Sequence, residues 1–378
     1  MGDLFQSTGG FLFGTVVPFL FVLTIVVFFH ELGHYLVARW NKVKIEAFAV
    51  GFGPELFGFT DKHKTRWKVC AIPLGGYVKF LGDDGVASTP DREKLSHLSQ
   101  EEFAGTFESK SVGQRAAIAV AGPIANFILA IAIFTATFMI YEQVVREAVV
   151  GEVVEGMPAE AAGFQKGDRI TAINGTPVKS FEDLQRIVSV RYDQGLTIDI
   201  IRGNQKKSLS VTPKMTEHKD RFGNEFNQGM LGIRSSSDKN DYQLISLGPW
   251  DAFVAAVDRT FYVAQRTLYF IYEIITGHQE AKQLRGPAGI AEVSSQVATL
   301  GIAPLISLAA LLSISIGLLN LFPIPMLDGG HLLYYAVEAI RGKALSPKMQ
   351  DLGFRIGIAC VFGLLIFATF NDITRILS

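Results

Sequence analysis

Cysteine is almost missing from this chain of 378 residues, which contains only Cys70 and Cys360. The two lie in very different segments, so neither a disulfide framework nor a zinc site built from cysteine thiolates is expected. An excess of charge is missing too: the net charge is -1, which argues against nucleic-acid binding. The N-terminus lacks the basic segment and small-residue cleavage site of a signal peptide, so its apolar run is interpreted as a retained span.

Apolar residues make up 49% of the chain, with 29 Phe among them, and they are gathered in blocks. A helix that crosses the bilayer core needs about 20 consecutive apolar residues. Four blocks are long and apolar enough to span the bilayer, which predicts a multi-span α-helical membrane protein with four transmembrane helices. They cover residues 11–37, 116–141, 302–322 and 354–370.

Lys and Arg are concentrated in two connecting loops, and this predicts the orientation of the chain. Short loops rich in these residues stay on the cytoplasmic side of the lipid bilayer. The long segment between the second and third spans then lies outside, as do both termini. The charges are Arg39, Lys42, Lys44, Lys62, Lys64, Arg66 and Lys68 after the first span, and Arg341, Lys343 and Lys348 after the third.

Residues 43–81 are rich in Gly, Phe and Val, a composition typical of β-structure rather than helix. Apolar and polar residues alternate in part over 67–72, Gly75 and Gly76 supply a turn, and 77–80 resume the strand pattern. The apolar content predicts a membrane-associated, re-entrant β-hairpin. Non-helical backbone at membrane depth must be shielded by protein or line a cavity.

A small α/β domain is predicted at residues 148–212, inserted between the second and third spans. The pattern GMPAEAAGFQKGDRI at 156–170, followed by ING at 173–175, resembles bacterial PDZ domains, and the chain carries one such copy. Strands are expected over 149–154, 169–173, 196–201 and 208–211, and helices over 158–162 and 181–190.

The remainder of this long segment is expected to be a linker over 213–250, where 230–233 hint at a strand, and an amphipathic helix over 250–276. That helix lies either on a soluble surface or in the membrane interface. The predicted domains are residues 1–147, the first half of the membrane core; 148–212, the PDZ-like domain; 213–300, the linker and amphipathic segment; and 301–378, the second half of the membrane core.

The sequence HELGH at residues 30–34 stands at the far end of the first span. Two histidines four residues apart lie on one helix face, where both imidazoles reach one zinc ion. Glu31 beside them can take a proton from a water molecule. Such a motif also occurs by accident, as an interfacial His pair, but ionisable groups at membrane depth are costly and usually functional.

A catalytic zinc site usually has three protein ligands and an open position for water. The second and fourth spans offer no carboxylate within their apolar stretches. The third span ends in NLFPIPMLDGGH at 320–331, which contains Asp328 and His331. Both side chains suit zinc, while a helix N-cap is the alternative role for Asp328 and an interfacial position the alternative for His331.

Two distant motifs, HELGH in the first span and NxxPxPxLDG at 320–329 in the third, resemble the site-2 protease family of intramembrane metalloproteases. The inserted PDZ-like domain makes the chain similar to the bacterial branch of the regulator of sigma-E protease type. GPIANF at 122–127, the Gly-rich hairpin and FND at 370–372 extend the likeness over nearly the whole chain. Members of that branch often carry two PDZ domains, so the substrate gating of two-domain members does not transfer directly.

The resemblance implies zinc bound by His30, His34 and Asp328, with Glu31 as the catalytic base. It implies an intramembrane zinc metalloendopeptidase that cleaves the transmembrane segments of single-span proteins in regulated intramembrane proteolysis. The implied substrates are proteins already trimmed by another protease, such as anti-sigma factors, and remnant signal peptides. The implied location is the bacterial inner membrane, where the charge of the loops predicts that both termini and the PDZ-like domain lie in the periplasm and the site near the cytoplasmic face.

A helical substrate must be unwound before its peptide carbonyls are accessible. The hairpin around Gly75 and Gly76 can add an unwound stretch as a strand, and Pro323 and Pro325 leave carbonyls without helical partners. The resemblance supports substrate holding by Asn320, with interhelical hydrogen bonding as the alternative. The PDZ-like domain is expected either to bind a peptide or C-terminus or to exclude bulky outer domains.

Asn126 in the second span has the same two interpretations, and the small neighbours Gly122 and Ala125 favour packing. Two other functions compete with the protease. A membrane-anchored zincin for soluble substrates would take its third ligand soon after the histidines, yet Glu46 and Glu55 lie in hairpin-like sequence. An inactive membrane-anchored PDZ scaffold would have no use for both halves of the zinc site.

Overall fold

A computed structural model describes residues 12–83, 92–219, 225–236, 238, 241–277, 279 and 281–377. The chain forms two compact units, each described by itself. The first unit comprises residues 1–137, 253–271 and 284–378, and the second comprises 138–252 and 272–283.

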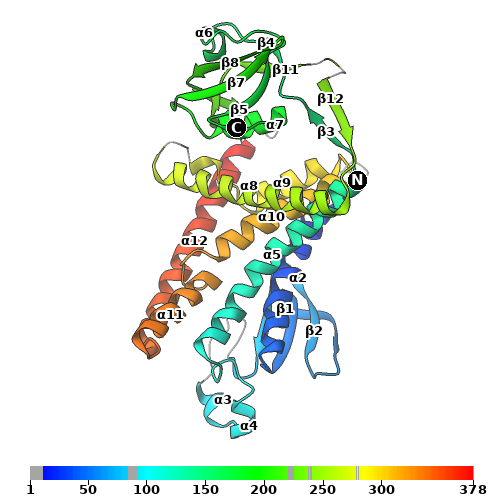
Figure 1. Ribbon diagram of the computed structural model, residues 1–378. Helices are drawn as coiled ribbons and strands as arrows, with labels where there is room; N and C mark the ends of the chain where they lie inside the picture. The colour runs from blue at the N-terminus through cyan, green and yellow to red at the C-terminus, as the bar shows by residue number, and fades with distance from the viewer. Residues whose placement is uncertain are drawn as a thin grey trace. The chain divides into compact units, whose positions relative to one another are not determined.

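Long apolar helices dominate the first unit (Figure 1). Among the described residues, four helices are long and apolar enough to cross a membrane, at the positions expected from the sequence. The start of the first predicted span, at residue 11, lies outside the described residues. The helices are α2 (Val17–Trp40, preceded by one π-helical turn, Leu12–Val16), α5 (Val112–Ile140), α10 (Ile302–Asn320) and α12 (Pro347–Leu377).

Local sequence explains where these helices begin and end. Pro18 occupies the first turn of α2, where its missing N–H costs nothing, and the Asn41 amide donates to the Val37 carbonyl at the other end. The helix α10 stops at Asn320 because Pro323 and Pro325 cannot continue it. The unit also contains the shorter helices α3 (Arg92–Ser96), α4 (Gln100–Phe103), α9 (Pro287–Ala298) and α11 (Asp328–Arg341).

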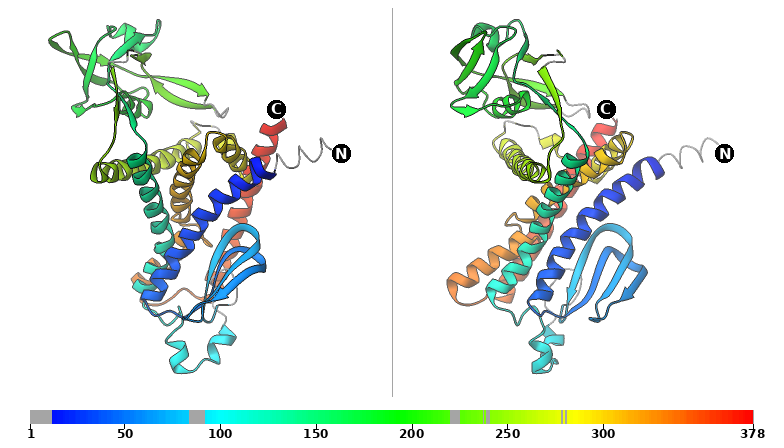
Figure 2. Two further views of the ribbon diagram at one scale, coloured as in Figure 1. Left: turned by 90° about the vertical axis from the view of Figure 1, so that its right-hand side faces the viewer. Right: turned by 45° about the vertical axis from the view of Figure 1, so that its right-hand side comes forward.

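The predicted hairpin is present as the antiparallel strands β1 (Ile45–Thr60) and β2 (Arg66–Phe80). Its curved ribbon lies along α2 in both views of Figure 2, and Phe48 packs its ring against Phe28 of α2 at 5.6 Å. The sequence misplaced the turn. The strands are joined at residues 61–65, where Asp61 accepts hydrogen bonds from backbone N–H groups, whereas Gly75 and Gly76 lie inside β2.

Gly75 and Gly76 bend β2 rather than end it. Gly75 has a φ of +120°, a conformation that favours glycine, and Gly76 pairs with Val50 of β1. The bend lets residues 47–50 of β1 pair with 76–79 of β2 on one side and with 66–69 on the other. The outer half of the hairpin is apolar and exposed, at Leu56, Phe57 and Phe59.

The second unit contains the elements predicted for residues 148–212. A sheet in the order β6-β5-β7-β8 and two helices enclose a core that includes Val150, Ile173 and Ile198. The elements are β4 (Val150–Val153), α6 (Pro158–Ala161), β5 (Arg169–Ile173), β6 (Thr176–Pro177), α7 (Phe181–Ser189), β7 (Leu196–Arg202) and β8 (Gln205–Val211).

The prediction of a linker over 213–250 is wrong for most of that stretch. Four strands form there, β11 pairs with β4, and Leu231 is 5% exposed within the core. The expected helix at 250–276 is present as α8 (Pro249–Ile275), and its place at a membrane interface stays a prediction. The strands are β9 (Lys214–Lys219), β10 (Glu225–Met230), β11 (Ile233–Ser235) and β12 (Tyr242–Ile245), which pairs with β3 (Gln143–Arg146).

Candidate metal centre

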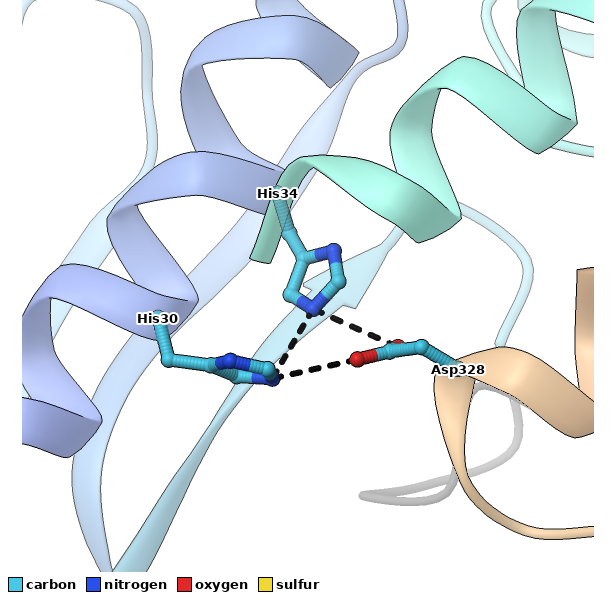
Figure 3. A group of neighbouring side chains, drawn as sticks. All are labelled: His30, His34 and Asp328. Atoms are coloured by element: carbon cyan, nitrogen blue, oxygen red, sulfur yellow. Dashed lines mark hydrogen bonds and ion pairs between the residues drawn. The ribbon is translucent and has the colours of Figure 1, made fainter. Parts of the chain in front are cut away.

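The two histidines of the HELGH sequence lie one turn apart near the C-terminal end of α2. Both side chains turn toward α11, as Figure 3 shows. Their Nε2 atoms are 3.3 Å apart, and the rings meet edge to face at 4.9 Å between centroids. The two Nε2 atoms therefore face one point, where a cation could bind both of them.

Asp328 completes the group from the first turn of α11, where Leu327 is the N-cap residue and Asp328 follows it. Its Oδ2 is 3.2 Å from Nε2 of His30, and its Oδ1 is 3.4 Å from Nε2 of His34 (Figure 3). The carboxylate therefore does not serve as the helix N-cap. Within the described chain, this is the one cluster of ligand-type side chains close enough to bind a metal ion, and His331 is not in it.

The three donor atoms fit zinc. Bonds of about 2.0–2.1 Å in tetrahedral geometry place neighbouring donors about 3.3–3.4 Å apart, and the observed separations are 3.2, 3.3 and 3.4 Å. Two imidazoles and one carboxylate are donors that zinc accepts, and three protein ligands leave a fourth position for water.

A cavity of about 210 Å³ adjoins the three ligands and also contains Glu31. The opposite wall comes from strand β2, including Gly76 and Val78. A Cβ atom on Gly76 would stand 3.0 Å from Cγ of Glu31 and 2.7 Å from the Ala49 carbonyl oxygen. The strand backbone therefore lies directly beside the Glu31 side chain.

Two glycines let α5 pack closely against α2, the helix that carries His30 and His34. A Cβ atom on Gly122 would lie 2.3 Å from Nε2 of His34 and 2.8 Å from Cε1 of His30. A Cβ atom on Gly33 would lie 2.3 Å from the Ala121 carbonyl oxygen. Only residues without side chains fit at these two contacts, so the sequence GPIANF forms one wall of the metal centre.

Two contacts from α5 reach the outer nitrogens of the imidazoles. Nδ1 of His34 is 2.8 Å from the Ile118 carbonyl oxygen, and Nδ1 of His30 is 3.2 Å from the amide of Asn126. A ligating histidine usually binds an acceptor through its other nitrogen, which fixes the ring orientation. The small neighbours of Asn126 predict packing, whereas the structure places its amide beside His30. The one sequence signal for this contact is an amide in an apolar span, four residues after Gly122.

The substrate residues expected from the sequence separate into two groups. Asn320 and Gly76 line the cavity, and the Asn320 amide is 3.4 Å from Nε2 of His30. Gly75, Pro323 and Pro325 are not among the described lining residues. A Cβ atom on Gly75 would touch Phe52, and Pro325 lies against α12, where a Cβ atom on Gly357 would overlap its carbonyl.

An ion pair ties the second ligand-bearing helix to α5. Arg115 donates to Glu338 of α11 at 2.7 Å and lies over the ring of Tyr335, 5.1 Å from its centroid. Both partners are largely buried, which makes the pair costly to break. This ion pair therefore links α5 to α11, the helix that carries Asp328, at a point outside the cavity.

Comparison with known proteins agrees with this chemistry. The model of peptidase family M50 matches residues 18–364. A protein of Agrobacterium fabrum named as a zinc metalloprotease is 48% identical over 378 residues, with 100% of both chains covered. One of Rhizobium meliloti with the same description is 48% identical over 95% of this chain and 96% of its own. Metalloprotease MmpA of Caulobacter vibrioides is 38% identical over 95% of each chain.

Proposed function

Because the chain belongs to peptidase family M50, the site-2 protease family, and is a zinc metalloprotease, we propose that it cleaves peptide bonds inside the membrane. The observation that carries this is the position of the ligands. His30 and His34 belong to a helix long and apolar enough to span a bilayer, and Asp328 follows the end of another. A site built from such helices meets substrates that are themselves membrane segments.

The proposed reaction is hydrolysis of a peptide bond by an activated water. Zinc, when bound by His30, His34 and Asp328, supplies Lewis-acid chemistry that polarises the scissile carbonyl and acidifies water. Glu31 takes the proton from the attacking water and delivers it to the leaving amine. Asn320 holds the substrate backbone or the developing oxyanion with its amide.

The strand β2 supplies a template for the unwound substrate. Its residues 76–78 face the cavity beside Glu31, and an extended peptide can pair with a strand through main-chain hydrogen bonds. Gly76 keeps this face free of a side chain. Pro323 and Pro325 act indirectly, because they end α10 and set the turn that presents Asp328.

We further propose the substrate class and the location. The substrates are single-span membrane proteins already trimmed by another protease, anti-sigma factors among them, and remnant signal peptides. The chain lies in a bacterial inner membrane, with the metal centre near the cytoplasmic face and both termini in the periplasm. The cytoplasmic placement is supported by the Lys and Arg that follow α2.

The second unit acts, in this proposal, as a PDZ-like filter that binds a peptide or C-terminus or excludes bulky outer domains. The fold of this unit determines which residues a deletion experiment should remove. Leu231 belongs to its core and β11 pairs with β4, so excising only 148–212 would leave a broken core. Removing 148–240 instead keeps the pair of β3 and β12 as a short hairpin. Faster cleavage of an untrimmed substrate after excision supports exclusion, and slower cleavage of a trimmed one supports recruitment.

The decisive experiment compares membranes that contain the active protein with membranes that contain Glu31→Gln. Fragments are sequenced by mass spectrometry, and metal content is measured on both purified proteins. We expect equal zinc in both, and fragments cut within an apolar segment only with the active protein. Cuts confined to soluble segments would instead support a zincin for soluble substrates, and a zinc-free active protein would contradict the proposal outright.

A further inference from the structure

A second cavity, of about 520 Å³, lies where the end of α2 meets α4 and the start of α5. These elements come together at the same end of the helices in both views of Figure 2. Because α2 and α5 are both candidate membrane spans, a cavity between the end of one and the start of the other lies where the chain leaves the bilayer. A lipid headgroup is the ligand most abundant at that level.

The charge of this cavity is positive. Lys42 and Lys110 line it, no Asp or Glu does, and neither lysine forms an ion pair with any residue that the structure describes. Lys110 donates to the Ala104 carbonyl at 2.6 Å, which leaves the ammonium charge unbalanced. Burial and the neighbouring charge of Lys42 lower the pKa of Lys110. An anion between the two lysines would relieve this repulsion.

The uncharged groups of the cavity also favour an anion. Gln114 lines it, and its Oε1 is occupied by the N–H and hydroxyl of Ser111, 3.1 and 3.2 Å away. Its amide nitrogen therefore remains as a donor. The first turn of α5 adds the positive end of a helix of 29 residues. The Ala104 carbonyl, the acceptor in this wall, already binds Lys110 and the Ser109 hydroxyl.

Two aromatic side chains flank the polar groups. Trp40 is 84% exposed and Phe103 is 41% exposed, and both line the cavity. Trp is enriched where helices cross the membrane surface, because its ring lies among glycerol groups and its N–H reaches water. Basic pockets between helices at this level bind anionic headgroups. We propose that this cavity binds an anionic phospholipid, with the phosphodiester between Lys42 and Lys110 and the glycerol against Trp40.

The site would brace the metal centre from a distance. Trp40 and Lys42 follow His34 at the end of α2, and Lys110 precedes Ile118 on α5, whose carbonyl binds Nδ1 of His34. A lipid bound to both helix ends holds together the two helices that make this contact. The proposal rests only on the membrane helices and the cavity, so it stands or falls independently of the proposed proteolysis.

The test measures lipid retention by native mass spectrometry on the zinc-loaded full chain, offered phosphatidylglycerol and phosphatidylcholine in equal amounts. We expect one tightly retained phosphatidylglycerol, with affinity about 30-fold lower in the double variant Lys42→Gln, Lys110→Gln, because about 1 kcal/mol per lysine is about fivefold in affinity for each. The double variant Lys343→Gln, Lys348→Gln removes the same charge from the other basic loop and should retain the lipid. Lys42→Arg with Lys110→Arg should also retain it.

Three outcomes would overturn the proposal. Equal retention by the Gln variants at 42 and 110 and by the parent would show that the lipid binds elsewhere. Retention of phosphatidylcholine as tightly as phosphatidylglycerol would remove the role of charge. Displacement of the lipid by millimolar inorganic phosphate, with no preference for the lipid, would make this a free-phosphate site. An unchanged helical circular-dichroism spectrum in all variants shows that loss of lipid is not loss of fold.

Discussion

Nδ1 of His30 on α2 lies 3.2 Å from the side-chain amide of Asn126 on α5. When Nε2 of His30 binds a metal, Nδ1 carries the proton and needs an acceptor. Asn126 is fully buried, and its Oδ1 has no hydrogen-bond partner among the described residues. Half a turn of the amide brings this oxygen to Nδ1, which satisfies both atoms. In the proposed zinc site, Asn126 would therefore be a positioning residue for His30.

Replacing Asn126 by Ala is therefore expected to weaken zinc binding about 10–100-fold, because His30 loses the group that fixes its orientation. Asn126→Asp keeps an acceptor oxygen and should restore most of the affinity. Zinc affinity is measured by competition with a chelator, apart from any activity. Ser313→Ala is the matched control, since Ser313 donates to the main-chain oxygen of Asn126. Equal losses in the Asn126 and Ser313 variants would indicate packing alone.

Gly122→Ala tests the wall of the metal centre. The new methyl group would stand 2.3 Å from Nε2 of His34, closer than any real contact, so the ligand must move. We expect zinc content to fall on the order of tenfold while the protein remains in the membrane. Gly113→Ala changes the same helix at a position with no atom within 4 Å and should bind zinc normally. Normal zinc in Gly122→Ala would show that α5 stands back from the ligands.

The contrast between these two glycines shows what the sequence could and could not reveal. Membrane spans can be predicted from sequence because each is a continuous apolar run. The closeness of His30 and His34 can be predicted too, because both belong to one helix. Two contacts could not be predicted in this way: Gly122 with His34, and Asn126 with His30. Both depend on how α2 packs against α5, and no local sequence pattern determines that packing.

The two wrong predictions, the hairpin turn and the linker, also arose where structure depends on contacts distant in sequence. Gly75 and Gly76 signalled a break in strand geometry, yet glycine does not distinguish a turn from a bend within a strand. The strands after residue 213 are short and mostly polar, so their sequences resemble a linker. They become strands through pairing, as β11 does with β4, and Leu231 becomes core through tertiary contact.

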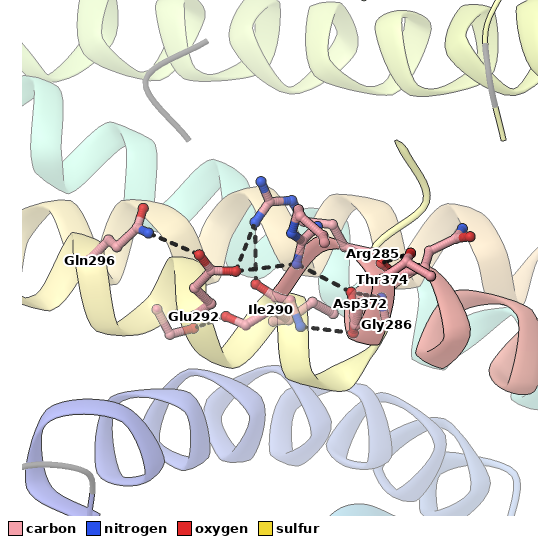
Figure 4. A network of polar contacts seen from close by, with 11 residues as sticks. Arg285, Gly286, Ile290, Glu292, Gln296, Asp372 and Thr374 are labelled. Carbon is pink, nitrogen blue, oxygen red and sulfur yellow. Dashed lines mark hydrogen bonds and ion pairs between the residues drawn. The ribbon is translucent and has the colours of Figure 1, made fainter. Parts of the chain in front are cut away.

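Asp372 near the end of α12 binds the beginning of α9, as Figure 4 shows. Its buried carboxylate accepts hydrogen bonds from the N–H groups of Gly286 and Gly289, at 3.1 and 2.8 Å. Asp372→Asn replaces one carboxylate oxygen by an NH₂ group that faces a backbone N–H. The free energy of unfolding should therefore fall by about 1–3 kcal/mol. Thermal unfolding in detergent measures this. Asp351→Asn, in an exposed pair with Arg355 on the same helix, should change little.

Asp83, just after β2, gives a prediction about pH. Burial is the main cause that raises its pKa from 3.8 to about 7, and Glu108 and Glu46 add to it, while the Phe80 N–H and Lys79 act in the opposite direction. Between these two values the folded state holds more protons than the unfolded state. Stability therefore falls as pH rises through this window, and the loss is complete above about pH 7.

Asp83→Asn removes the ionisable group and keeps an oxygen for the Phe80 N–H, which donates to Oδ2 of Asp83 at 3.2 Å. The variant should match the parent at about pH 4 and exceed it by on the order of 2 kcal/mol at about pH 8, after allowance for incomplete burial. Thermal midpoints at fixed scan rate across this range provide the measurement. A gain of the same size at both ends would mean that the amide packs better, and that the cost of ionising a buried carboxyl is not what limits stability here.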